Sequence, residues 1–149
     1  MEKIKNTVKP IAKNQQYKKV PAAPVYLSPS AKKHWKQVAK ILIDAEVLKP
    51  THLTGLEVLV DAKAQFEYAV RAIQKSNRKK AGSGYIQQFS TGAKNISVEQ
   101  TLKRDAIKTM MQCLKQFGLD PKSEKELNTE PSNQLNLFDG IMKELKKTS

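Results

Sequence analysis

The stretch that decides the fold reads THLTGLEVLVDAKAQFEYAVRAIQKS and spans residues 51–76. Its apolar residues recur mostly at steps of three and four as far as Ile73, the period of an α-helix with one buried face. The stretch has no proline, and its single glycine, Gly55, falls in the first turn after Thr51, the expected N-cap. At 1.5 Å per residue, about 25 residues form a rod of roughly 37 Å. The sequence therefore predicts one long helix to which the rest of the chain is added.

A shorter helix precedes this rod. Ser28 supplies a hydroxyl for the N-cap, and Pro29 occupies the first helical position, where the missing N–H has no partner to lose. An apolar stripe that includes Trp35 predicts one buried face. We expect Pro50 to end the helix, because proline disfavours helical geometry in the residue before it. The short connection to residues 51–76 allows two arrangements, a folded-back helical hairpin or a crossed helix-turn-helix.

A second long helix is predicted after the loop of residues 77–96, which contains three glycines. Alternation in this loop is compatible with a short β-hairpin but does not require one. Ser97 begins a capping-box pattern, apolar residues then recur at helical spacing as far as Phe117, and Gly118 fits the residue after the C-cap. The predicted fold class is all-α, a long helical hairpin core with a shorter helix before it.

The two ends of the chain have a different composition from this helical domain, which spans residues 28–121. Residues 1–27 hold three prolines among lysines and show no sustained period, so we expect a flexible basic arm. Residues 122–149 form a polar linker and a short amphipathic tail. The apolar stripe of that tail has two interpretations, a late part of the core or a peptide that docks on a partner.

The charge distribution indicates a polyanionic partner. Lysine and arginine number 27 against 14 aspartate and glutamate residues, which leaves +13 at pH 7. Residues 1–40 alone carry ten lysines and one glutamate, a net +9. Lysines also serve simply to keep a chain soluble, but so strong an asymmetry favours nucleic acid. A phosphate-binding surface is therefore expected on the N-terminal segment and the first helix.

The sequence contains no constellation that indicates catalysis or a cofactor. In residues 79–84, lysines and glycines stand in the wrong order for a phosphate-binding P-loop. The single cysteine, Cys113, lies on an apolar stripe, so we expect it to be a core residue. We expect His34 and His52 to be surface or boundary residues, and no Cys/His group has the spacing of a zinc site. The expectation is a non-enzymatic protein with no metal and no cofactor.

Hydropathy gives no reason to expect a membrane partner. No apolar run approaches the ~18 residues of a membrane-spanning helix. The first residues are polar and lack the apolar stretch of a signal peptide. We therefore expect a soluble, intracellular protein.

Three short motifs resemble the small terminase subunits of tailed phages. They are LSPSAK at residues 27–32 with Trp35 shortly after, VL at residues 47–48 before the long helix, and FGLDP at residues 117–121. The similarity covers about residues 25 to 125. It departs from the family at residues 95–96, Asn-Ile where Asn-Pro is frequent, and after the last motif, where an arginine of the family is absent.

The resemblance implies a non-enzymatic DNA-recognition subunit of a genome-packaging motor. Such a subunit assembles as a ring in the cytoplasm of the bacterial host, selects viral DNA and delivers it to the large terminase subunit, which carries the ATPase and the nuclease. Expected partners are double-stranded DNA, further copies of the chain and the large subunit, with the portal as an additional candidate. Residues 28–121 are then the DNA-binding and oligomerisation domain, and residues 122–149 carry the partner-docking tail.

Three sets of residues are assigned to these roles. The residues expected to contact DNA are Lys9, Lys13, Lys18, Lys19, Lys32, Lys33, Lys36, Lys40, Arg78, Lys79 and Lys80. The residues expected to support oligomerisation are Leu56, Val60, Val70, Ile73, Leu102, Met110 and Phe117. The residues expected to dock the large subunit or the portal are Leu135, Phe138, Ile141, Met142 and Leu145.

Two other classes of protein fit part of the sequence. A dimeric helix-turn-helix regulator would use the two helices on either side of Pro50 and read an operator with defined half-site spacing. An RNA-binding or ribosome-associated basic protein would share the charge, although the chain lacks the strand-borne aromatic motif of the common RNA-binding sheet fold.

Overall fold

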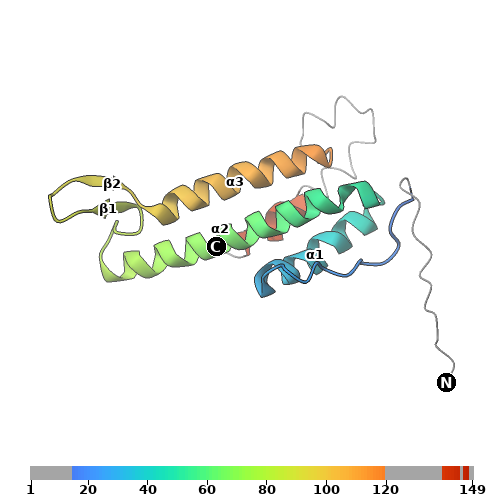
Figure 1. Cartoon of the computed structure of the whole chain (residues 1–149), viewed down its shortest axis with the longest axis horizontal. Coiled ribbons are helices and arrows are strands. Elements are labelled where there is room, and N and C mark those ends of the chain that lie inside the picture. Colours follow the sequence, from blue (N-terminus) through green and yellow to red (C-terminus); the bar gives the residue numbers. More distant parts are fainter. Residues whose placement is uncertain (1–14, 120–138, 145, 148–149) are drawn as a thin grey trace, which may run out of the picture.

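The computed structural model describes residues 15–119, 139–144 and 146–147, and it is mostly helical. Its two long helices lie side by side as an antiparallel pair, with a small β-hairpin at one end (Figure 1). A shorter helix folds back along the other half of the pair, and residues 139–144 add a further helical turn. The elements are α1 (Pro29–Asp44), the 3₁₀ turn η1 (Pro50–His52), α2 (Leu53–Lys79), β1 (Ile86–Gln88), β2 (Lys94–Ile96) and α3 (Val98–Gln116).

The predicted hairpin of long helices is confirmed, and α1 follows the folded-back alternative. In α1, the Ser28 hydroxyl accepts the Ala31 N–H at 3.2 Å, as the N-cap pattern predicts. The helix ends at Asp44, before Pro50, because Glu46 adopts a positive φ of 58°. In that conformation the Val47 N–H donates to the Leu42 carbonyl at 3.0 Å and turns the chain away from the helix axis.

The long rod begins differently from the sequence-based expectation. Thr51 is not an N-cap, because it lies inside η1, from which α2 continues at Leu53. The Nδ1 atom of His52 lies 2.8 Å from the Val47 carbonyl oxygen, and its ring meets Phe117 edge-on with centroids 5.4 Å apart. These contacts hold the start of α2 against the end of α3. The 27 residues of α2 reach Lys79 and form a rod of about 40 Å.

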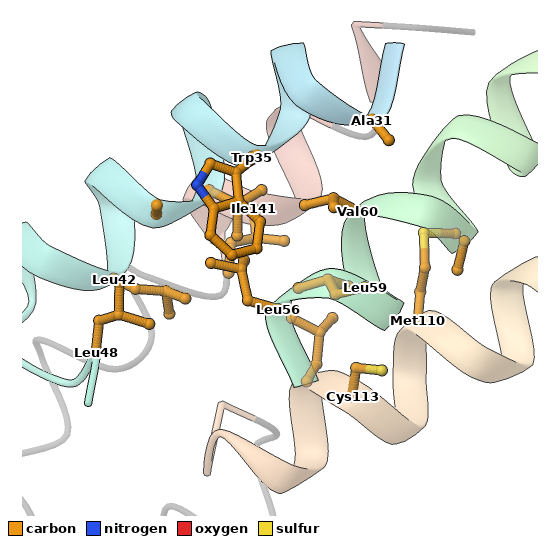
Figure 2. Packing of buried hydrophobic residues seen from close by; sticks show 14 of the residues in the cluster. Ala31, Trp35, Leu42, Leu48, Leu56, Leu59, Val60, Met110, Cys113 and Ile141 are labelled. Atoms are coloured by element: carbon orange, nitrogen blue, oxygen red, sulfur yellow. The ribbon is translucent and has the colours of Figure 1, made fainter. Parts of the chain in front are cut away.

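The main hydrophobic core lies at the α1 end of the molecule. Side chains of α1, α2 and α3 converge there, with Ile141 among them (Figure 2). Trp35 is only 1% exposed, and its indole N–H donates to the Pro21 carbonyl at 2.8 Å. The Tyr17 N–H donates to the Leu48 carbonyl at 2.9 Å, so residues 15–27 form an extended strap along α1. The predicted boundary at residue 28 therefore falls inside a packed region, and residues 1–14 lie outside the described part of the chain.

At the other end, hydrogen bonds attach the β-hairpin to both long helices. The Gly84 N–H donates to Asn77 Oδ1 at 2.8 Å, and the Ser97 hydroxyl donates to the Gly84 carbonyl at 2.6 Å. Ser97 also accepts the Gln100 N–H at 3.1 Å, which is one half of the predicted capping box. The other half is not formed, because the Ser97 N–H donates to the Tyr85 carbonyl instead.

The C-terminus of α3 agrees with the sequence. Gly118 has a φ of 69°, and the Leu119 N–H donates to the Leu114 carbonyl at 3.0 Å, the bond that defines a Schellman motif. Within the ranges that the structure describes, no helix is long and apolar enough to cross a lipid bilayer.

Candidate nucleic-acid interface

The lysines of α1 gather on the face of the helix that points away from the core. Lys33, Lys36 and Lys40 are exposed and Lys32 is half-buried. Lys32, Lys36 and Lys40 follow one another at steps of four, and Lys33 lies three residues before Lys36, so all four share one helical face opposite the buried stripe of Trp35. Three of them, Lys32, Lys33 and Lys36, line a single shallow hollow together with the first turn of the helix. The structure thus brings the four predicted α1 residues into one surface.

This lysine face has no acidic counterpart on its own helix. The first acidic residue of α1 is Asp44, at its last position. Within the described part of the chain, none of the four lysines forms an ion pair. An unneutralised row of ammonium groups attracts a polyanion more strongly than one paired with carboxylates. The surface is therefore suited to phosphate groups.

The remaining predicted DNA contacts lie elsewhere. Lys18 and Lys19 are exposed on the strap, between its anchor at Leu48 and its anchor at Trp35. Lys9 and Lys13 are outside the described residues.

The basic cluster at the end of α2 is separate from the lysine face. Arg78, Lys79 and Lys80 are all exposed. Glu67 of α2 faces the first turn of α1, and Arg78 follows eleven residues later, about 16 Å further along the rod. Within the described helices, the predicted DNA contacts therefore form two basic regions rather than one.

A buried polar cluster joins α1 to α2. His34, expected at the surface or boundary, is only 1% exposed, because the return of α1 along α2 covers it. Its Nε2 atom lies 2.9 Å from Glu67 Oε2, and its Nδ1 atom lies 3.3 Å from Gln37 Oε1. Burial by itself would raise the pKa of the Glu67 carboxyl, but the His34 hydrogen bond, the charge of Arg71 and the Ser30 hydroxyl together lower that pKa.

The same cluster contains the residue types of a hydrolase triad, but not its geometry. The Ser30 hydroxyl lies 3.5 Å from His34 Nε2, and the Glu67 carboxylate meets the same nitrogen. In a working triad the carboxylate orients one ring nitrogen, and the serine hydroxyl uses the other as its base. The arrangement in this chain therefore joins two helices and does not activate a nucleophile.

Cys113 is equally unsuited to chemistry. Its side chain lies in the core of the helical pair, as the sequence predicts, and burial raises the pKa of its thiol. Among the described residues, no three His, Cys, Asp or Glu side chains gather in a group that could hold a metal ion.

Comparison with known protein families agrees with the resemblance to small terminase subunits. The sequence matches the family described as "Phage terminase, small subunit" over residues 31–134, well over half of the chain. The chain belongs to the phage terminase small subunit family. Searches of the curated proteins and of the solved structures find no match.

This small terminase subunit also contains a buried lysine that was not predicted from the sequence. Lys63 lies on the inner face of α2 and is 2% exposed. Burial lowers the pKa of its ammonium group, the carboxylates of Glu144 and Glu67 act in the opposite direction, and Lys33 adds to the lowering. Its burial could have been predicted from its position four residues after Leu59, inside the apolar stripe of α2.

Most residues assigned to oligomerisation are already used within one copy of the small terminase subunit. Leu102 and Phe117 are half-buried, and the other five are buried by the subunit's own helices. These side chains hold α2 and α3 together as a rod. The five buried residues are Leu56, Val60, Val70, Ile73 and Met110.

Only part of the C-terminal apolar stripe lies within the described residues, and that part packs on the core. Ile141 is buried in the core and Met142 packs against it. For these two residues the tail is therefore a late part of the core, the first of the two interpretations given above. Leu135, Phe138 and Leu145 lie outside the described residues.

Proposed function

We propose that this small terminase subunit is the non-catalytic DNA-recognition component of a genome-packaging motor in the cytoplasm of the bacterial host. It binds double-stranded DNA and delivers it to the large terminase subunit, which carries the catalytic activities. The observation that carries the proposal is the lysine face of α1, four cations on one helical face that form no ion pair within the described part of the chain.

The chemistry of this face favours contact with the DNA backbone. Lysine offers a compact charge to phosphate oxygens, whereas base reading relies mainly on bidentate Arg, Asn or Gln side chains in a groove. Arg78, Lys79 and Lys80 at the hairpin end, and the lysines of the arm and strap, add further phosphate contacts in this proposal. Each neutralised phosphate contributes roughly −0.9 to the slope of log affinity against log salt, so binding weakens steeply as salt rises.

Assembly into a ring multiplies these contacts. Several weakly binding surfaces on one object give an avidity far above that of a single surface. In this proposal the seven predicted oligomerisation residues act by building the stiff α2–α3 pair. The part of the tail around Leu135, Phe138 and Leu145 remains our candidate for docking the large subunit or the portal, whereas Ile141 and Met142 contribute through the core.

Reversal of charge on α1 tests the proposal. The triple variant Lys32→Glu, Lys33→Glu, Lys36→Glu should bind duplex DNA at least about tenfold more weakly at low salt, and its salt slope should fall by about one unit per lysine. Fluorescence anisotropy with labelled duplex across a salt series measures both quantities. Native mass spectrometry should show unchanged assembly, because the three side chains lie outside the α2–α3 contact.

A matched triple variant on α3 controls for net charge. Lys103→Glu, Lys108→Glu, Lys115→Glu makes the same charge change on another helix. If both triples lose affinity equally, net charge rather than the lysine face governs binding. Unchanged affinity of the α1 triple at low salt would remove these residues from the DNA-binding surface.

A further inference from the structure

The β-hairpin end exposes an unusual concentration of apolar side chains. Tyr85, Ile86, Phe89, Ile96 and Val98 are between 47% and 69% exposed and fall within fourteen residues. They are five of the twelve large hydrophobic residues that are exposed in the described ranges. Concentrated apolar exposure of this kind marks an interaction surface, whereas isolated exposed apolar residues are ordinary.

The register of the hairpin sorts these side chains onto two different faces. Ile86 pairs with Ile96, and the bonds from Ser97 N–H to the Tyr85 carbonyl and from Phe89 N–H to the Ala93 carbonyl extend the ladder on both sides. Because side chains alternate along a strand, Tyr85 and Phe89 share one face, here called the aromatic face. Ile86 and Ile96 share the opposite one, the isoleucine face.

Neither face is covered by the residues that the structure describes. Every residue of β1 and β2 is exposed, and an isolated two-stranded ribbon is only marginally stable in water. Two shallow hollows adjoin the isoleucine face. One is lined by Ile96 and Val98 with α3 residues that include Leu102, Arg104 and Asp105. The other is lined by Ile86 and Lys94 with the turn of residues 80–83. The isoleucine face therefore offers space for protruding side chains.

The charge pattern indicates what occupies this surface. Residues 81–93 contain no charged side chain, the longest such run in a chain with a net charge of +13. Lys94, on the isoleucine face, is the only charged residue of the two strands. DNA binds through phosphate contacts with several cations, so a largely apolar ribbon with one lysine is a poor site for it. Two copies of a strongly cationic protein repel each other, and they approach most easily where each carries the least charge. A second copy of this chain therefore fits the hairpin best.

We infer that the hairpin is the self-assembly surface of this subunit, with the aromatic face of one copy packed on the isoleucine face of the next. This inference rests on the ring assembly proposed above and names the contact that builds it. A head-to-tail contact covers both faces of every hairpin, whereas a contact between two aromatic faces leaves both isoleucine faces in water. Head-to-tail contacts between identical subunits close into a ring when the rotation between them permits.

Paired threonine variants of the full chain test the contact. Tyr85→Thr with Phe89→Thr removes the aromatic face, and Ile86→Thr with Ile96→Thr removes the isoleucine face. Threonine has a high strand propensity, so the hairpin is retained. The control is Val58→Thr with Tyr68→Thr, two exposed apolar residues of α2. Circular dichroism verifies the helical fold, and native mass spectrometry with light scattering reports assembly.

We expect the wild type and the control to assemble and each hairpin variant to be monomeric. An equimolar mixture of the two hairpin variants should give a dimer and nothing larger, because only one complete contact is available between them. Self-association of the isoleucine-face variant alone would overturn the head-to-tail contact in favour of aromatic pairing. Wild-type assembly by both variants would overturn the inference, and loss of large-subunit binding without loss of assembly would assign the surface to that partner.

Failure of this inference is separable from failure of the proposed function. DNA binding by the α1 triple variant and its α3 control is measured independently of the hairpin. A monomeric wild type would overturn both the hairpin contact and the ring, and would leave the lysine face to be judged by its own experiment.

Discussion

At the α1 end of the molecule, α2 and α3 are covered by α1, by the strap of residues 15–27 and by residues 139–144, whereas at the hairpin end these two helices cover mainly each other (Figure 1). The first region buries a tryptophan and a large leucine cluster. The second buries small or medium side chains and exposes its largest ones. The α1 end therefore buries its large apolar side chains within one chain, whereas the hairpin end exposes them to solvent.

The largest expected loss of stability comes from a substitution in the core at the α1 end. Trp35→Ala removes the largest buried side chain of the core and its hydrogen bond to the strap, and it should lower the free energy of unfolding by about 3–5 kcal/mol. Urea denaturation followed by circular dichroism measures the loss. The Phe89→Thr substitution is the counterpart at the hairpin end, and it should leave the unfolding of a dilute monomer nearly unchanged because Phe89 is exposed. Equal losses in the two variants would contradict the difference between the regions.

A smaller effect is expected at the base of the hairpin. A Cβ at Gly84 would lie 2.4 Å from the Ile73 carbonyl oxygen, so Gly84→Ala must push the hairpin away from α2. We expect a loss of about 1–3 kcal/mol, the usual range for overpacking. Hydrogen exchange should show faster exchange in residues 84–97 and little change around Trp35.

Gly55→Ala is the matched control for this substitution. A Cβ there makes only an ordinary contact of 3.5 Å with the Phe117 ring, and alanine is favoured in a helix. This variant should be neutral or slightly more stable. Uniform acceleration of exchange along the whole rod in Gly84→Ala would show that the two ends unfold as one unit.

The smallest expected effect has the opposite sign. Lys63→Met removes a buried cation and should raise the free energy of unfolding by about 1 kcal/mol at neutral pH. Because burial lowers the pKa of Lys63 in the folded state, the unfolded chain binds more protons between that lowered pKa and the usual 10.5. Wild-type stability should therefore rise with pH in this alkaline window, relative to the variant. A parallel pH dependence in both proteins would contradict the assignment to Lys63.

Local signals explain what the sequence predicted correctly. The Ser28 cap, the Gly118 stop and the apolar stripe that contains Trp35 are each determined within one or two helical turns, so they are visible in a single stretch of residues. The lysine face of α1 is visible for the same reason, since helical spacing alone places its members together. The sequence does not show how far this face lies from Arg78. That distance depends on the length of α2 and on the point along α2 where α1 packs.

The features that were missed depend on contacts distant in sequence. His34 is buried because α1 folds back along α2, which also brings Glu67, 33 residues away in the sequence, within 2.9 Å of its Nε2 atom. The strap has no period of its own. It is held because its Pro21 carbonyl accepts the Trp35 indole N–H and its Tyr17 N–H donates to the Leu48 carbonyl. The N-cap assigned to Thr51 was wrong because the preceding proline starts a 3₁₀ turn, in which a serine or threonine is not required for capping.

The unbroken length of α2 gives the molecule the properties of a strut. Beyond its first turn the helix contains neither proline nor glycine, so it resists bending over about 35 Å. If DNA is held beside α1 and neighbouring subunits meet at the hairpin, this strut sets the distance between the duplex and the subunit junctions. Insertion of seven residues in each of α2 and α3 would lengthen it by about 10 Å and change the diameter of the assembly without altering either contact.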